Sequence, residues 1–247
     1  MRCRSATLHA RGAVAVVIGC GLIALAAGLL GVNPAAAAPA VLGLDVSDHQ
    51  HSVNWSSVAS HGAQFAYIKA TEGTGFVNPD FASQYDGAYQ AGIIRGAYHF
   101  ALPNDSSGAA QASYFVANGG GWSADGRTLP GALDIEYNPY GAECYRLSKT
   151  AMVAWIASFN YRYESLTSVW PVIYTTSQWW AKCTGNYAGF GNQDPLWIAS
   201  YGATQGTLPA GWAFCTFWQY SDKGTFPGDQ DLFNGSRSDL IRLATAR

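Results

Sequence analysis

The sequence predicts a single α/β domain with a parallel sheet, of a length that suits a small eight-stranded barrel. Short, almost continuously apolar or β-branched runs recur along the chain, helical patterns lie between several of them, and about 207 residues follow the N-terminal segment. Strands that are apolar on both faces are typical of a sheet covered by helices on both sides. A chain of this length leaves no room for a second globular domain.

The first forty residues are set apart from this domain, which we place at residues 41–247. An arginine-containing start precedes an apolar run over residues 12–32, and an alanine-rich tail offers A-x-A sites ending at Ala38 and Ala40. This order is typical of a secretory signal peptide, so we assign residues 1–40 to one and expect a secreted protein. An uncleaved membrane anchor is the alternative, because the apolar run is about as long as a membrane span.

The runs predicted to form strands are rich in Val, Ile, Leu, Phe and Tyr. They cover residues 41–46, 65–70, 93–102, 129–136, 169–176, 195–201 and 214–220. One helix is predicted with Asn78 as its N-cap, Pro79 in its first turn and Gly92 just past its end. A second helix is predicted from Ser148, because apolar residues recur there at helical spacing. After residue 165 the strands follow one another closely, so we expect the last part of the barrel to lack some of its helices.

Charge and aromatic content limit the classes of partner. Three of the fourteen basic residues lie before residue 41 and all sixteen acidic residues lie after it, which leaves the domain with a net charge of −5. Nucleic acid is therefore not expected as a partner. The chain has nine Trp and fourteen Tyr but only 12% charged residues. Most aromatic side chains are expected in the core, and some could provide faces on which sugar rings stack.

Three cysteines remain in the domain. Cys144 lies in a loop rich in Gly and Pro, Cys183 in a Cys-Thr-Gly turn, and Cys215 within an apolar run. Export from the reducing cytosol permits a disulfide. We predict that Cys144 pairs with Cys183 and that Cys215 is a small buried hydrophobic residue.

Several predicted strands end in polar residues that a core strand would not carry, among them Asp45, Glu72, His99, Asp134 and Glu136. In α/β barrels the C-terminal strand ends form the face on which active sites are built. Asp134 and Glu136, at positions i and i+2 of a strand, should point to the same face with backbones roughly 6.6 Å apart. Two close carboxyls repel when both are ionised, so one should keep its proton to higher pH. That pair suits a general acid and a carboxylate that stabilises positive charge on a sugar.

Other chemistries find no support in the motifs. The sequence has no G-x-S-x-G elbow, no H-E-x-x-H and no paired C-x-x-C. We therefore expect neither a serine nucleophile, a metal site nor a cofactor. His49 and His51, close together in a loop, are expected to be polar surface residues and not ligands. The D-x-x-D-x-D-x-E pattern of a related class of barrel chitinases fails as well, because its nearer required Asp falls on Ala132.

An ordered set of segments across the domain resembles the Chalaropsis-type lysozymes, glycoside hydrolase family 25. The segments are GLDVS (43–47), YIKATEG (67–73), GAYHF (96–100), LDIE (133–136), VIY (172–174), WIA (197–199), WQY (218–220) and a late Asp before FNG (233–235). The resemblance implies an irregular TIM-like barrel with eight strands and fewer than eight helices. It also implies cleavage of the β-1,4 bond between N-acetylmuramic acid and N-acetylglucosamine in bacterial peptidoglycan.

The resemblance extends to individual residues. Glu136 matches the proton donor of the family, and Asp45, Asp134 and Asp229 match its other catalytic carboxylates. Asp231 is an alternative to Asp229, because only Gln230 separates the two. Positions that line the sugar groove in the family are matched by Lys69, Tyr98, Phe100, Tyr174 and Trp197. The predicted bridge between Cys144 and Cys183 also resembles one found in part of the family.

Several alternatives stay open at the level of sequence. The backbone spacing of Asp134 and Glu136 does not separate a retaining from an inverting or a substrate-assisted mechanism. A non-catalytic wall-binding lectin and a hydrolase of chitin or another amino-sugar polymer are the rival functions. We expect a monomer that acts on cell-wall peptidoglycan and has no obligate protein partner.

Overall fold

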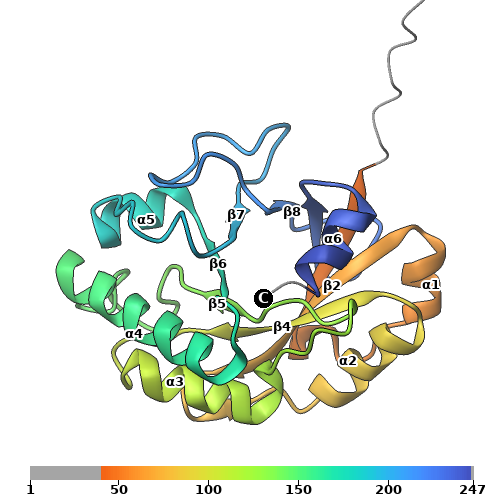
Figure 1. Ribbon diagram of the computed structural model, residues 1–247, viewed down its shortest axis with the longest axis horizontal. Helices are drawn as coiled ribbons and strands as arrows, with labels where there is room; N and C mark the ends of the chain where they lie inside the picture. The colour runs from red at the N-terminus through yellow and green to blue at the C-terminus, as the bar shows by residue number, and fades with distance from the viewer. Residues whose placement is uncertain (1–39, 246–247) are drawn as a thin grey trace, which may run out of the picture. The chain divides into compact units, whose positions relative to one another are not determined.

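Eight strands close into a barrel in the computed structural model, which describes residues 40–245 (Figure 1). In order around the barrel they are β1 (Val41–Val46), β2 (Ala63–Glu72), β4 (Ile94–Phe100), β5 (Ala132–Asp134), β6 (Val172–Thr175), β7 (Leu196–Ala199), β8 (Phe217–Ser221) and β9 (Asp229–Phe233). Pairing of β1 with both β2 and β9 closes the ring. The predicted export signal lies outside the described residues except for Ala40. Within the described part of the chain, no helix is long and apolar enough to cross a membrane.

The eight strands of the ring are parallel with one exception, which the sequence did not predict. Strand β9 runs antiparallel to both of its neighbours, β8 and β1. A short strand, β3 (Phe76–Val77), also pairs antiparallel with β2 outside the ring. The strand predicted over residues 129–136 is shorter than expected, so Glu136 lies two residues beyond the end of β5. Because β9 is reversed, its first residue lies at the end of the barrel where the parallel strands finish.

Six α-helices accompany the strands in the described residues, so the predicted irregular barrel with fewer than eight helices is confirmed. They are α1 (Trp55–Ser60), α2 (Phe81–Gln90), α3 (Gly108–Phe115), α4 (Lys149–Thr167), α5 (Ser177–Thr184) and α6 (Arg237–Leu243), with short turns η1 (Asp48–Gln50) and η2 (Val116–Gly120). Figure 1 shows α1 to α4 following one another along the outside of the strands. The connections from β7 to β8 and from β8 to β9 contain no helix, as the close spacing of the strands predicts.

Two helix starts test the predicted capping. Helix α4 begins directly after Ser148, which confirms the predicted start, and the Ser148 side chain caps it by accepting a hydrogen bond from the Ala151 amide. The predicted cap of α2 is wrong, because Asp80 and not Asn78 occupies the N-cap position. Asn78 is buried, and its side-chain amide donates to the Lys69 carbonyl oxygen at 2.8 Å. The oxygen of the same side chain accepts from the Asp80 amide at 2.9 Å, so Asn78 still contributes a hydrogen bond at the start of α2 although it lies before the N-cap.

Aromatic side chains fill the barrel beneath its C-terminal end. The Tyr67 ring stacks on Trp197 with centroids 4.8 Å apart and meets Phe217 edge-on at 5.4 Å. Glycines make room for these rings, since a Cβ on Gly96 would lie 2.4 Å from the Tyr67 ring and one on Gly43 equally close to Phe65. Small barrels have just enough interior for side chains to fill it. The aromatic packing therefore forms a solid floor below the strand ends.

The opposite face of the strands packs against the helices. Leu133 and Ile135 are fully buried in the cluster that includes residues of α3 and α4. His99 also points to this side, where its ring stacks on Phe159 of α4 at 5.4 Å and its two nitrogens bond with Thr71 and Gln111. Burial lowers the pKa of His99 to about 4, so it is a neutral core residue. Alternation along β5 therefore sends Asp134 toward the barrel interior.

Candidate active site

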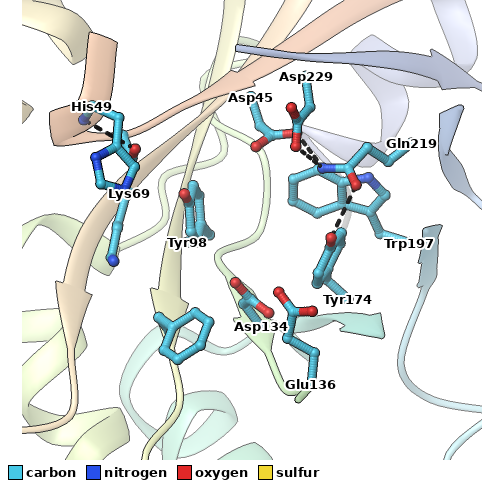
Figure 2. Close-up of a pocket in the computed structure, with 12 residues that line it drawn as sticks. Asp45, His49, Lys69, Tyr98, Asp134, Glu136, Tyr174, Trp197, Gln219 and Asp229 are labelled. Carbon is cyan, nitrogen blue, oxygen red and sulfur yellow. Dashed lines mark hydrogen bonds between the residues drawn. The ribbon is translucent and has the colours of Figure 1, made fainter. Parts of the chain in front are cut away.

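A pocket of about 200 Å³ opens at the end of the barrel where the parallel strands finish (Figure 2). All nine residues that the sequence assigns to catalysis or sugar binding line it: Asp45, Lys69, Tyr98, Phe100, Asp134, Glu136, Tyr174, Trp197 and Asp229. Ser47, His49 and Gln219 line it as well, although no sequence motif assigns them to the site. His49 is exposed, as expected, but it lies at the pocket wall.

The four carboxylates come from two parts of the barrel. Asp45, near the end of β1, pairs in register with Asp229, the first residue of the reversed β9. Asp134 ends β5, and Glu136 follows two residues later. Figure 2 shows Asp45 beside Asp229, and Asp134 beside Glu136 across the pocket. The closed barrel thus places Asp45 beside Asp229, although the two are 184 positions apart in sequence (229 − 45).

Gln219 in β8 connects the carboxylate pair to the aromatic wall. Its side-chain nitrogen donates to Asp45 at 2.8 Å and to Asp229 at 2.9 Å. Its side-chain oxygen accepts from the hydroxyls of Tyr174 at 2.9 Å and Tyr201 at 3.1 Å. Gln219 is buried, so these four bonds fix which end of the amide faces the acids. In the sequence, Gln219 is a polar residue within the apolar run at 214–220, and this exception could have identified it as a site residue.

Asp229 and Asp231 occupy different depths of the barrel. Asp229 is half-buried and lines the pocket, whereas Asp231 is fully buried and does not. Asp231 accepts a hydrogen bond from the Trp197 indole at 2.9 Å. Burial, and secondarily the charge of Asp45, raises the pKa of Asp231 well above its ordinary value. Asp231 therefore lies below the pocket, and Asp229 is the one that faces it.

Burial raises the pKa values of the pocket acids. The pKa of Glu136 is raised to about 7, first by burial and then by the charge of Asp229. The pKa of Asp45 is also raised to about 7, by burial and again by Asp229. For Asp134, burial and the nearby Glu136 raise the pKa well above its usual range, while Lys69 opposes the shift. At least one carboxyl of the cluster therefore holds a proton near neutral pH, as acid catalysis requires.

Lys69 brings positive charge to the carboxylate-rich pocket. Its ammonium nitrogen lies 2.6 Å from Glu72, and it sits over the rings of Phe76 and Phe100 at 5.4 and 5.2 Å. Glu72 also accepts a hydrogen bond from the exposed Tyr140 at 2.6 Å. Glu72, which the sequence singled out at a strand end, therefore holds Lys69 in place and does not itself line the pocket.

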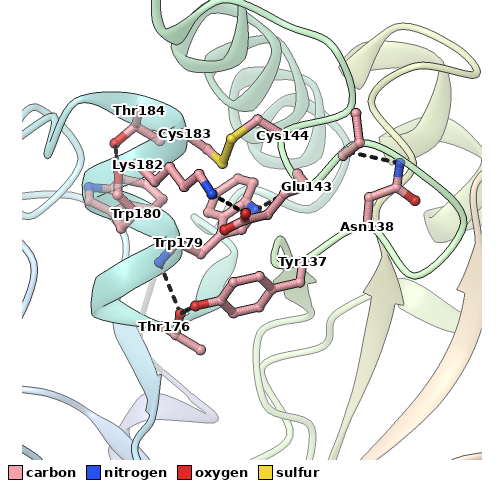
Figure 3. Close-up of a disulfide and its surroundings, with 11 residues drawn as sticks. Tyr137, Asn138, Glu143, Cys144, Thr176, Trp179, Trp180, Lys182, Cys183 and Thr184 are labelled. Atoms are coloured by element: carbon pink, nitrogen blue, oxygen red, sulfur yellow. Dashed lines mark hydrogen bonds and ion pairs between the residues drawn. A yellow bond between two sulfur atoms is a disulfide. The ribbon is translucent and has the colours of Figure 1, made fainter.

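The predicted disulfide ties the loop after Glu136 to helix α5 (Figure 3). Cys144 and Cys183 are bonded, with their Cα atoms 5.3 Å apart, and Cys215 is free and buried, as predicted. Cys183 lies in the last turn of α5, however, and not in a turn outside a helix. An ion pair between Glu143 and Lys182 accompanies the bridge. The disulfide and the ion pair therefore fix the loop that follows Glu136 against helix α5.

Replacing both Cys144 and Cys183 with Ser should lower the free energy of unfolding by about 2–4 kcal/mol, because the bridge closes a long loop in the unfolded chain. The bridged residues are 39 positions apart. Denaturant unfolding of the variant and the wild type measures the difference. Wild-type protein unfolded with a reductant is the matched control and should resemble the variant. Equal unfolding free energies for variant and oxidised wild type would contradict the expected contribution.

The fold and the pocket together define a class of protein. Acid side chains and aromatic rings surround a pocket at the C-terminal strand ends of an α/β barrel, the face that carries active sites in this fold. Paired carboxyls, one of them protonated near neutral pH, are the catalytic groups of most glycoside hydrolases. These features define a carbohydrate-cleaving barrel enzyme.

Comparison with known proteins narrows this class to a family. The family model described as glycosyl hydrolases family 25 matches residues 44–229. Lysozyme M1 of Streptomyces globisporus is 55% identical over 209 residues, which cover 83% of this chain and 71% of the relative. The N,O-diacetylmuramidase of Chalaropsis sp. is 49% identical over 209 residues, covering 83% of this chain and 99% of the relative. The chain belongs to glycosyl hydrolase family 25, and the predicted resemblance is confirmed.

A solved structure supports the same assignment at the level of the fold. The muramidase of Acremonium alcalophilum superposes with a TM-score of 0.83 at 57% sequence identity. The superposition covers 84% of this chain and 100% of the muramidase. The barrel described above is therefore the fold of a solved muramidase.

Proposed function

We propose that the protein is a lysozyme that hydrolyses the β-1,4 bond between N-acetylmuramic acid and N-acetylglucosamine in bacterial peptidoglycan. The observation that carries the proposal is the convergence of Asp45, Asp134, Glu136 and Asp229 on one pocket. Relatives named as a lysozyme and as an N,O-diacetylmuramidase support the choice of substrate. Export to the cell exterior and action as a monomer without an obligate protein partner are part of the same proposal.

In this proposal Glu136 donates its proton to the oxygen of the leaving sugar. Glu136 is partly exposed at the pocket, and its pKa of about 7 keeps much of it protonated near neutral pH. Asp134, assisted by Asp45, stabilises the positive charge that develops on the sugar ring as the bond breaks. Both of these carboxyls are buried, which strengthens their interaction with a charge in the pocket.

Five further residues are proposed to bind the sugar. They are Lys69, Tyr98, Phe100, Tyr174 and Trp197. The rings are held rigidly, since Trp197 packs against both Tyr98 and Tyr174 at centroid distances of 6.4 and 4.8 Å. Side chains fixed in this way lose little conformational entropy when a sugar binds.

The two late aspartates should respond differently to mutation. Asp229→Asn removes a carboxylate from the pocket and should lower kcat/KM by about tenfold or more. Asp231→Asn should keep kcat/KM within about threefold of wild type, because Asp231 does not line the pocket and the oxygen of an Asn of the same shape can still accept from the Trp197 indole. Steady-state kinetics on soluble peptidoglycan fragments measures both. The reverse order of effects would transfer the catalytic assignment to Asp231.

Product analysis tests the function itself. Purified protein is incubated with peptidoglycan and, separately, with chitin, and the new reducing ends are reduced with borohydride and identified by mass spectrometry. The proposal predicts muramic acid at the new reducing ends of peptidoglycan. Glucosamine ends would indicate the chitin-type hydrolase, and sedimentation with peptidoglycan without any new ends would indicate the wall-binding lectin.

A further inference from the structure

A second and larger hollow adjoins the catalytic pocket. Its volume is about 750 Å³, and Glu136 and Tyr174 line both spaces. Ligand sites in proteins commonly measure roughly 300–1,000 Å³, so the hollow is large enough to hold part of a sugar chain. None of the other acids of the catalytic pocket lines it. Glu136 therefore stands at the junction between a space rich in carboxylates and one without them.

The walls of the hollow are polar but almost uncharged. Helix α5 and the residue before it contribute Thr176, Ser177 and Gln178, and the connection after β7 contributes Ser200, Tyr201 and Gln205. Glu136 is the one acidic or basic side chain among the described residues that line it. Hydroxyl and amide groups of this kind match the hydroxyl and acetamide groups of an uncharged amino sugar. A carboxylate-bearing peptide would find no cation here.

The connection that forms one wall is long but held in place. It runs over residues 200–216 without a helix, between β7 and β8. The Ser177 hydroxyl donates to the Thr207 carbonyl oxygen at 2.6 Å, and the Ala210 amide donates to the Asn186 side chain at 2.9 Å. The Trp212 indole donates to the Asp194 carbonyl oxygen at 2.7 Å. The wall is thus preformed, so binding against it would cost little ordering of the chain.

Tyr201 offers the hollow an aromatic face. Its side chain is 56% exposed, and its hydroxyl donates to Gln219 at 3.1 Å. This bond anchors one end of the ring to the network that holds Asp45 and Asp229. An exposed ring fixed at one end presents a rigid apolar face to solvent, of the kind on which a sugar ring can stack.

The position of Glu136 determines in which direction a bound sugar chain runs across the two spaces. A general acid must lie next to the oxygen that joins the cleaved sugar to its leaving group. The sugar that becomes positively charged belongs among Asp45, Asp134 and Asp229, which line the first pocket alone. The leaving part of the chain then continues past Glu136 into the second hollow.

We propose that this hollow binds the leaving-group side of the glycan, N-acetylglucosamine and the sugar after it, with Tyr201 as the stacking face. The proposal rests on the function proposed above and adds the orientation of the chain. The hollow recognises the sugars through their uncharged hydroxyl and acetamide groups. The stem peptide of the next muramic acid therefore projects away from the walls of the hollow.

Two substrates with the same cleaved sugar and different leaving groups test this assignment. One releases 4-methylumbelliferone and the other releases a short sugar chain that begins with N-acetylglucosamine. The ratio of their kcat/KM values removes effects on the acids that face the shared cleaved sugar, and an unchanged pH profile with the sugar leaving group shows that Glu136 still donates its proton. Tyr201→Ala should reduce the preference for the sugar leaving group by about tenfold. Tyr201→Phe keeps the ring and should retain most of the preference.

Tyr161→Ala is the matched control, since Tyr161 is also an exposed tyrosine, 61% accessible, on the outer helix α4. It should leave the ratio unchanged. An unchanged ratio in Tyr201→Ala would overturn the proposal. If the wild-type protein cleaves neither substrate, the proposed function is contradicted. Binding in the hollow is then tested separately, by titrating the wild type and each variant with tri-N-acetylchitotriose. A Kd about tenfold higher for Tyr201→Ala alone would support the hollow as the binding site of this oligosaccharide. Equal Kd values in all variants would refute the proposal.

Discussion

Replacing Glu136 with Gln should lower kcat for peptidoglycan hydrolysis by about 100- to 10,000-fold, with little change in KM, because the amide has no proton to give the leaving oxygen. Gln has the shape of a protonated Glu, and the pKa of Glu136 of about 7 means that the native side chain is already largely neutral below that pH. Burial and packing should therefore change little. Rates of reducing-end release from peptidoglycan measure the loss, and thermal unfolding checks the fold.

The leaving group provides the control for this variant. A substrate whose leaving group departs without protonation, such as a dinitrophenyl glycoside, should be cleaved by Glu136→Gln at a rate within about tenfold of wild type for the bond-breaking step. Glu164→Gln, on helix α4 outside both spaces, should behave as wild type with every substrate. An equal loss with good and poor leaving groups would show that Glu136 does not act as the proton donor.

Asp134→Asn should lower kcat/KM by about 100- to 1,000-fold, because the amide cannot ionise to stabilise the positive charge that develops on the sugar in the transition state. Asp134 is buried at the end of β5, between Leu133 and Ile135, which pack on the outer face of the barrel. These neighbours fix the backbone, so the substitution changes the charge and not the position of the side chain. Steady-state kinetics on peptidoglycan fragments measures the effect.

The fold of this variant is expected to survive, since the high pKa of Asp134 means that its ionised form is destabilised by burial. Asp86→Asn, an exposed substitution on helix α2, is the control for loss of a carboxylate as such. Activity of Asp134→Asn within tenfold of wild type would remove Asp134 from the catalytic groups.

Local patterns in the sequence predicted much of this architecture. Apolar runs identified seven of the eight barrel strands, and helical spacing identified α4 and its start at Ser148. The alternation along β5 predicted that Asp134 would share a face with the residues two positions away. These features depend on neighbouring residues and can be read without knowledge of distant contacts.

The features that were missed depend on contacts between distant segments. Strand β9 begins Asp229-Gln230-Asp231, a polar pattern that predicts a turn and not a buried strand. Its burial is possible because Trp197 and Gln219, from other strands, donate hydrogen bonds to these acids. The hollow beside Glu136 is formed by α5 and the connection after β7, two segments that no local pattern places together.

The pH dependence of kcat/KM tests most directly whether the buried carboxylates keep Glu136 protonated near neutral pH. Activity should be present below about pH 7 and fall as the pH rises through that value, because Glu136 then loses the proton that it must donate. The charge of Asp229 contributes to the raised pKa of Glu136. In Asp229→Asn the falling limb should therefore move to lower pH, by roughly half a pH unit or more. A falling limb at the same pH in both proteins, or activity that rises through pH 7, would contradict this electrostatic role.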